Sequence, residues 1–153
     1  MTIRNKPAIM QVLQNTPEFK PAEVMVAEEL IDCYLDDPSG SGYYILVTEV
    51  DSSVIGYICY GLAPLTDGTW DIYWIAVAPK EQGQGIGSTL LASAESKIKK
   101  SQGRLVLIET SSKPEYEKTR LFYQSGGYQL VSRIADFYEP GDDKLTFQKR
   151  LSG

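Results

Sequence analysis

The chain has 153 residues with a hydrophobic content of 42%, which suits one globular domain with a single core over residues 1–153. Its net charge of -5 argues against a nucleic-acid partner, and no apolar run approaches the length of a membrane span or a secretion signal. With no histidine and only two cysteines, the sequence favours neither a metal site nor a disulfide framework, so we expect a cytoplasmic protein without a metal.

The N-terminal half is expected to hold a short strand, two helices and a β-hairpin. Apolar side chains recur at helical spacing in two segments, the second of which begins at Pro21 and has an acidic opposite side. Two strand-like runs are then separated only by Asp51 and Ser52, a spacing typical of an antiparallel hairpin. The expected ranges are a strand over 2–4, a helix over 8–15, a helix from 21 onward, and strands over 43–50 and 53–61.

A strand over 70–77 leads into a glycine-rich turn and then into the clearest helix of the chain. The apolar face of this helix consists of Ile86, Leu90, Leu91, Ala94 and Ile98. Lysines in its last turn complement the helix dipole, and Gly103 stands where a helix stop is expected. A continuous apolar run over 105–108 follows, which is typical of a strand buried on both faces.

The C-terminal part is expected to hold a short helix over 116–124 and two strands, 128–134 and 144–149, which flank a turn at 140–143. The whole order is β-α-α-β-β-β-α-β-α-β-β. It predicts an α+β fold, a three-layer α/β/α sandwich around a mixed, mostly antiparallel sheet.

The turn that opens the long helix reads Gln82-Gly83-Gln84-Gly85-Ile86-Gly87-Ser88. Such a turn points several backbone N–H groups at one spot, where the positive end of the helix dipole also lies, so it suits an anionic phosphate. It is not a dinucleotide fingerprint, because Ser88 stands where the third glycine belongs, and it lacks the lysine of a nucleotide-triphosphate loop. A tight turn without a ligand is the alternative.

The turn resembles the acyl-CoA signature of the GNAT (Gcn5-related N-acetyltransferase) superfamily, Arg/Gln-x-x-Gly-x-Gly/Ala. The expected element order also resembles the GNAT fold, and the likeness is strongest over residues 70–128. It implies acetyl-CoA as acetyl donor, with the backbone of Ile75, Ala76 and Val77 pairing with the pantetheine amides. The residues implied for the pyrophosphate are Gln82, Gly83, Gln84, Gly85, Ile86, Gly87 and Ser88.

A second motif, residues 122–128, resembles the family pattern Phe/Leu-Tyr-x-x-x-Gly-Phe/Tyr. The resemblance places Tyr123 at the tyrosine that contacts the cofactor and protonates the leaving sulfur. A phenol with an ordinary pKa near ~10 is protonated at neutral pH and can supply that proton. The alternatives are an aromatic side chain packed in the core and a tyrosine that only binds the sulfur.

The base that takes the proton from the acceptor amine is left open, since the chain has no histidine. Ribosomal-protein and N-terminal acetyltransferases of the family place a base glutamate at the position of Glu109, although its spacing of 14 residues to Tyr123 is longer than usual there. Asp71 lies eleven residues before Gln82, where histone acetyltransferases of the family carry a base glutamate. The third alternative is an amine that arrives already neutral.

Tyr116 departs from the family pattern, and Arg120 and the segment 135–143 each have two interpretations. Tyr116 stands where many members carry an asparagine that contacts pantetheine, so it would face the acceptor or leave the cofactor arm held differently. Arg120 would bond to the cofactor or lie in solvent. The segment 135–143, rich in acids and aromatics, would either hold an ammonium by charge and cation–π contact or form a solvated hairpin.

The resemblance predicts an acetyl-CoA-dependent N-acetyltransferase that acts on a primary amine of a small molecule or peptide. Direct transfer is expected, because no cysteine lies in either motif to carry the acyl group. The alternative is a non-catalytic acyl-CoA-binding or regulatory module with the same fold. A longer acyl group, the identity of the amine, and a monomer or homodimer are left open by the sequence.

Overall fold

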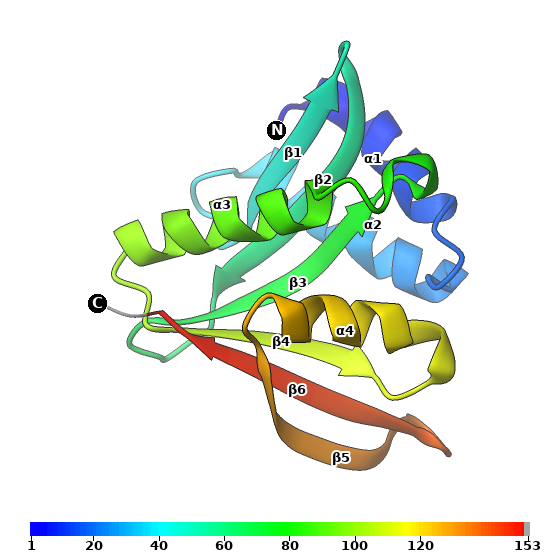
Figure 1. Ribbon diagram of the computed structural model, residues 1–153. Helices are drawn as coiled ribbons and strands as arrows, with labels where there is room; N and C mark the ends of the chain where they lie inside the picture. The colour runs from blue at the N-terminus through cyan, green and yellow to red at the C-terminus, as the bar shows by residue number, and fades with distance from the viewer. Residues whose placement is uncertain (152–153) are drawn as a thin grey trace.

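The computed structural model describes residues 1–151, which form a six-stranded sheet with helices on both faces (Figure 1). The strands lie in the order β1-β2-β3-β4-β6-β5, and only the β3–β4 pair is parallel. The helices are α1 (Lys6–Gln14), α2 (Pro21–Asp36), α3 (Ile86–Lys100) and α4 (Glu117–Ser125). The strands are β1 (Tyr44–Val50), β2 (Ser53–Leu62), β3 (Thr69–Val77), β4 (Leu105–Ser111), β5 (Gln129–Glu139) and β6 (Asp142–Arg150). The predicted α+β fold with a mixed, mostly antiparallel sheet is confirmed.

The predicted strand over 2–4 is wrong. Ile3–Asn5 form a single 3₁₀ turn, η1, that leads directly into α1. The side chain of Asn5 accepts hydrogen bonds from the backbone N–H of Thr2 at 2.8 Å and from its hydroxyl at 3.3 Å. These local bonds give the backbone an alternative to a sheet ladder, and the 72% exposed Ile3 has no core contact that would oppose it.

The two faces of the sheet carry separate cores. On one face, α3 and α4 cover a cluster that includes Ile58, Ile72, Val106, Ile108 and Phe147. On the other face, α1 and α2 pack on a cluster that draws its strand residues from β1, β2 and β3 only, Ile45, Val54, Tyr57, Cys59 and Ala76. This arrangement confirms the three layers (Figure 1), and no helix within residues 1–151 is long and apolar enough to cross a membrane.

The β4 strand is therefore buried on one face, not on both as its apolar run predicts. Val106 and Ile108 are fully buried under α3 and α4, whereas Leu105 and Leu107 are partly exposed. The reason is that α1 and α2 cover only β1–β3 on the opposite side. The following β5–β6 hairpin is also longer than expected, since Glu139 pairs with Asp142 and only Pro140 and Gly141 form its turn.

The sheet opens between β3 and β4. Their parallel pairing covers only Thr69–Ile72 and Leu105–Ile108, and the strands separate beyond these residues. On its other side, β3 pairs with β2, and the register of this pairing shifts between Cys59 and Tyr60. Such an irregularity bends the strand that carries the extra residue. The gap lies beside the N-terminus of α3 and beside α4, and so it determines where a ligand can enter the sheet.

Burial under α3 should dominate the stability of the fold. Leu91 of α3 is only 4% exposed and packs in the core under this helix, whereas Leu121 on α4 is 55% exposed. We expect Leu91→Ala to lower the free energy of unfolding by about 2–5 kcal/mol, because it removes buried methyl groups and leaves a cavity. The matched Leu121→Ala should change it by less than about 0.5 kcal/mol. Chemical denaturation of both variants measures the difference, and equal losses would contradict the packing described.

Candidate active site

A cavity of about 860 Å³ lies in the opening between β3 and β4. Its walls come from the β3 strand, the glycine turn and first turn of α3, the end of β4, and α4. Residues between α1 and α2, the end of β5 and the start of β6 line its other side. Among the predicted site residues, all but Gln84 line this cavity, so the fold brings together two motifs and two carboxylates that are far apart in the sequence.

The glycine turn has the geometry of an anion cradle. Gly83 and Gly85 have φ values of +82° and +81°, a left-handed conformation that favours glycine. The first hydrogen bond of the helix runs from the Thr89 backbone N–H to Gly85 O at 3.0 Å. The N–H groups of Ile86, Gly87 and Ser88 come before it and so have no acceptor within the helix. Gln82 turns away from them, because its side-chain amide donates to Val77 O at 3.1 Å. The turn thus presents backbone donors, and Gln82 closes the end of β3.

The edge of β3 that faces β4 is free over its second half. Ile75, Ala76 and Val77 pair with β2 on one side, while β4 pairs with β3 only up to Ile72. A strand edge of this kind offers unpaired N–H and C=O groups to an extended ligand. It runs along the cavity directly into the glycine turn.

Tyr123 places its hydroxyl at the cavity while its ring is packed in the core. The residue is 5% exposed, and its ring centre is 6.2 Å from that of Tyr128 and 6.3 Å from that of Phe147. Burial raises the pKa of Tyr123 above the ordinary value of a phenol, so the hydroxyl stays protonated at neutral pH. Within residues 1–151 it has no hydrogen-bond partner, which leaves its proton available to a ligand in the cavity.

The two candidate base carboxylates lie on one face of neighbouring strands and differ in their surroundings. Asp71 is half-buried and makes no ion pair within residues 1–151, whereas the 51% exposed Glu109 lies 3.2 Å from Lys144 Nζ. Burial raises the pKa of Asp71, the charge of Glu109 adds to that rise, and Lys144 opposes it. Its partial burial thus strengthens Asp71 as a base.

The raised pKa of Asp71 predicts a pH-dependent cost to stability. The charged form is disfavoured in the folded state, so the cost is fully present above the folded pKa and disappears below the ordinary carboxyl pKa. Asp71→Asn should therefore raise the melting temperature at pH 7, and this gain should vanish as the pH falls into the acid range. Thermal melts across pH test this, with the exposed Asp67→Asn as control. An equal gain at every pH would contradict it.

Two residues near the cavity have roles that the sequence did not predict. Tyr116 lines the cavity, and its hydroxyl donates to Glu18 O at 2.8 Å and lies 3.1 Å from Glu23 Oε2, so it ties the start of α4 to α2. Arg120 neither faces the cavity nor lies free in solvent. Its Nη1 donates to Ser111 O at 2.8 Å and Lys113 O at 2.9 Å, which holds the loop between β4 and α4. The Tyr116 bonds join segments more than 90 residues apart, and the Arg120 bonds depend on how the loop after β4 folds back on α4, so no short sequence pattern could have revealed them.

The segment 135–143 has features of both predicted alternatives, the hairpin and the charged aromatic wall. It forms a hairpin, yet Tyr138, Glu139 and Asp142 line the cavity. Glu139 pairs with Lys113 and lies 3.7 Å from Lys20, so it joins the hairpin to the segment between α1 and α2. The Phe137 ring does hold an ammonium by cation–π contact, but the ammonium is that of Lys144 at 4.6 Å.

The comparisons with known proteins agree with this architecture. The family model for the acetyltransferase (GNAT) domain matches residues 41–130. A Desulfovibrio desulfuricans protein assigned to the acetyltransferases of the GNAT family is 37% identical, with a TM-score of 0.95 and coverage of 98% of this chain and 94% of that one. No protein of curated function matches the chain significantly in sequence.

Two more distant structures share the fold. The ribosomal-protein-S18-alanine N-acetyltransferase from Escherichia coli has a TM-score of 0.77 at 16% identity, covering 100% of this chain and 93% of that one. An aminoglycoside 6'-N-acetyltransferase complexed with coenzyme A has a TM-score of 0.75 at 16% identity, covering 97% and 91%. From the family match over more than half of its length and the relative at 37% identity, the chain belongs to the GNAT family of acetyltransferases.

Proposed function

We propose that this acetyltransferase moves the acetyl group of acetyl-CoA directly to a primary amine of a small molecule or peptide. The observation that supports the proposal is that one cavity joins the glycine turn, the free edge of β3, the Tyr123 hydroxyl and the Asp71 carboxyl. A structural relative, the aminoglycoside 6'-N-acetyltransferase, is complexed with coenzyme A. This combination suits a donor that carries a pyrophosphate, two amides and a thioester.

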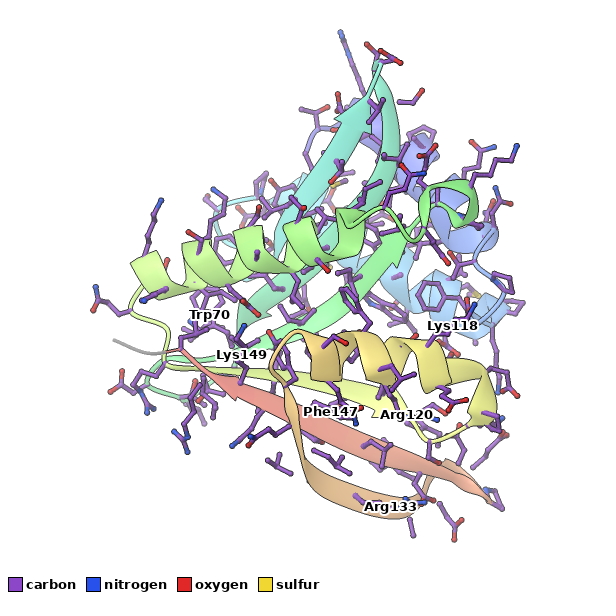
Figure 2. The ribbon with its side chains drawn as sticks, viewed as in Figure 1. Trp70, Lys118, Arg120, Arg133, Phe147 and Lys149 are labelled. Carbon is purple, nitrogen blue, oxygen red and sulfur yellow. The ribbon has the colours of Figure 1, made fainter. Side chains whose placement is uncertain are left out.

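The residues of the cavity fit acetyl-CoA in their donor chemistry. The N–H groups of Ile86, Gly87 and Ser88 would hold the pyrophosphate, and Lys118 on α4 lines the same cavity and adds positive charge (Figure 2). The backbone of residues 75–77 would pair with the pantetheine amides. When bound, acetyl-CoA supplies a thioester carbonyl that an amine can attack.

Two residues of this chain exchange protons with the substrates. Asp71, with its raised pKa, takes a proton from the acceptor ammonium and frees the nitrogen lone pair. Tyr123 donates its phenolic proton to the departing sulfur, which then leaves as a thiol rather than a thiolate. Glu109 is the second candidate for the proton acceptor, because it lines the same cavity one strand away.

Direct transfer is supported by the positions of the cysteines. Cys33 lies exposed on α2 and Cys59 is buried in β2, and neither lines the cavity. Burial raises the pKa of Cys59 to about 12, so that its thiol is a poor nucleophile at neutral pH. The acetyl group would thus pass to the amine without an acyl-enzyme.

The acceptor side of the cavity favours a cation. Besides Asp71 and Glu109, the lining carboxylates are Glu18, Glu23, Glu139 and Asp142, against the ammonium groups of Lys20 and Lys113 on the same side. A surplus of negative charge in a concave site attracts ammonium groups. This charge supports an amine acceptor.

A panel of small amines and short peptides, incubated with acetyl-CoA, tests the proposal. We expect release of CoA thiol that depends on one class of amine, together with an acetylated product found by mass spectrometry. Binding of acetyl-CoA without any acetylated amine would favour the non-catalytic acyl-CoA-binding alternative instead. Thiol release at equal rates with and without an amine would indicate hydrolysis rather than transfer.

A further inference from the structure

Lys144, a residue of β6, lies beside the carboxylates on the acceptor side of the cavity. Its Nζ is 3.2 Å from Glu109 Oε1 and 4.6 Å from the centre of the Phe137 ring. The Lys144 side chain is only 19% exposed. An ammonium placed between a carboxylate and an aromatic face is held by two independent contacts, so its position is better defined than that of an ordinary surface lysine.

The sheet register brings this lysine and both carboxylates to one face. Asp71 pairs with Leu107 of β4, and Glu109, two residues further on, therefore points to the same side as Asp71. Glu109 pairs with Thr146 of β6, which places Lys144 on that side as well. Three neighbouring strands thus contribute one charged group each to the face of the sheet that is opposite α3 and α4.

Three phenols also belong to the surroundings of Asp71 and Glu109. Tyr73 shares its strand, Tyr43 packs on Tyr73 with ring centres 5.5 Å apart, and Tyr138 comes from β5. Burial foremost raises the pKa of each of these phenols, that of Tyr73 to about 12, so they are uncharged near neutral pH. The charges that shift the pKa of Asp71 are consequently those of Glu109 and Lys144.

We propose that Lys144 is a positioning residue that pairs with Glu109 and thereby leaves Asp71 to take the proton of the acceptor ammonium. The inference rests on the proposed function. In this step an N–H bond of the ammonium breaks and an O–H bond forms on the Asp71 carboxylate, which becomes neutral. The nitrogen keeps the electron pair and would attack the thioester carbonyl, so that a C–N bond forms and the C–S bond breaks. The sulfur would take the Tyr123 proton, and the second N–H proton lost by the nitrogen would return to the Tyr123 phenolate, while Glu109 and Lys144 keep their charges.

The test removes the ammonium with Lys144→Met. Without it, the charge of Glu109 acts on Asp71 unopposed, so the pKa of Asp71 should rise further above its ordinary value. We expect this rise in the carboxyl NMR titration of Asp71 and, equally, in the acid limb of the pH profile of kcat/KM. Lys144→Arg should restore the original values, and Glu109→Gln should lower the pKa of Asp71 and move the acid limb to lower pH.

Lys149 provides a matched control on the same strand. Its Nζ is 3.0 Å from Glu95 Oε1 and 5.6 Å from the centre of the Tyr128 ring, an arrangement like that of Lys144 but on the α3 side of the sheet (Figure 2). Neither Lys149 nor Glu95 lines the cavity. Lys149→Met should therefore lower stability without moving the Asp71 titration or the acid limb.

The outcomes separate this inference from the proposed function. An active enzyme in which Lys144→Met leaves both titrations unchanged, or in which Lys149→Met moves them equally, overturns the role of Lys144 alone. Turnover that is lost in Glu109→Gln and kept in Asp71→Asn overturns the assignment of the proton to Asp71. A protein that acetylates no amine overturns the proposed function, and the NMR titration then still decides whether Lys144 controls Asp71.

Discussion

Tyr123→Phe lowers kcat by about 10²–10³-fold and leaves the dissociation constant of acetyl-CoA nearly unchanged. The variant keeps the ring, which packs against Phe122, Tyr128 and Phe147, and removes only the hydroxyl that borders the cavity. Without that proton donor the sulfur must leave as a thiolate. Steady-state kinetics together with a binding titration measure the two quantities separately.

Tyr128→Phe is the control for this substitution. Tyr128 is also buried, and its hydroxyl donates to Glu95 at 2.7 Å rather than facing the cavity. Loss of this hydrogen bond should lower stability and leave kcat within a factor of about two, since no reacting group is involved. Equal losses of kcat in the two variants would mean that the hydroxyl of Tyr123 matters only for packing.

Gly85→Asp weakens acetyl-CoA binding by about 100-fold or more. It places a negative charge where the pyrophosphate is expected, and like charges brought together in an interface cost several kcal/mol, each 1.4 kcal/mol being about tenfold in affinity. A side chain at φ +81° also adds about 1–2 kcal/mol of backbone strain. Titration of acetyl-CoA followed by the fluorescence of Trp74, which lines the cavity, measures the loss.

Gly42→Asp controls for the strain and the added charge. Gly42 has a φ of +82° and, like Gly85, open space around the position of a Cβ atom, but it lies in the loop before β1 and does not line the cavity. We expect comparable destabilisation by heat and unchanged affinity for acetyl-CoA. If both variants bound acetyl-CoA as the unchanged protein does, the glycine turn would not be the pyrophosphate site.

The elements that carry strong local signals were predicted from the sequence. The apolar face of α3 and the glycines before it determine that helix and its first turn with little help from the rest of the chain. The Asp51–Ser52 hairpin is equally local, since both residues adopt positive φ values in a two-residue turn. The prediction of a strand over 2–4 was wrong, because three residues give only a weak strand signal and the local turn at Asn5 satisfies the backbone instead.

The candidate site was predicted only as far as its two motifs extend. The positions of Gln82–Ser88 and Tyr123 follow from short patterns, and the structure places all of them except Gln84 on one cavity. The pairing of Lys144 with Glu109 depends on the β4–β6 register, and the bonds of Tyr116 and Arg120 depend on how loops pack. Such contacts join residues from different elements, and hydrophobic periodicity carries no information on them.

Calorimetric titration of the purified protein with acetyl-CoA, with free CoA as competitor, tests most directly whether the cavity between β3 and β4 is a cofactor site. The account predicts one site per chain, micromolar affinity, and competition by CoA through the shared pyrophosphate and pantetheine. A well-folded protein that releases or absorbs no heat of binding, and that also shows no thermal stabilisation by acetyl-CoA, would contradict it.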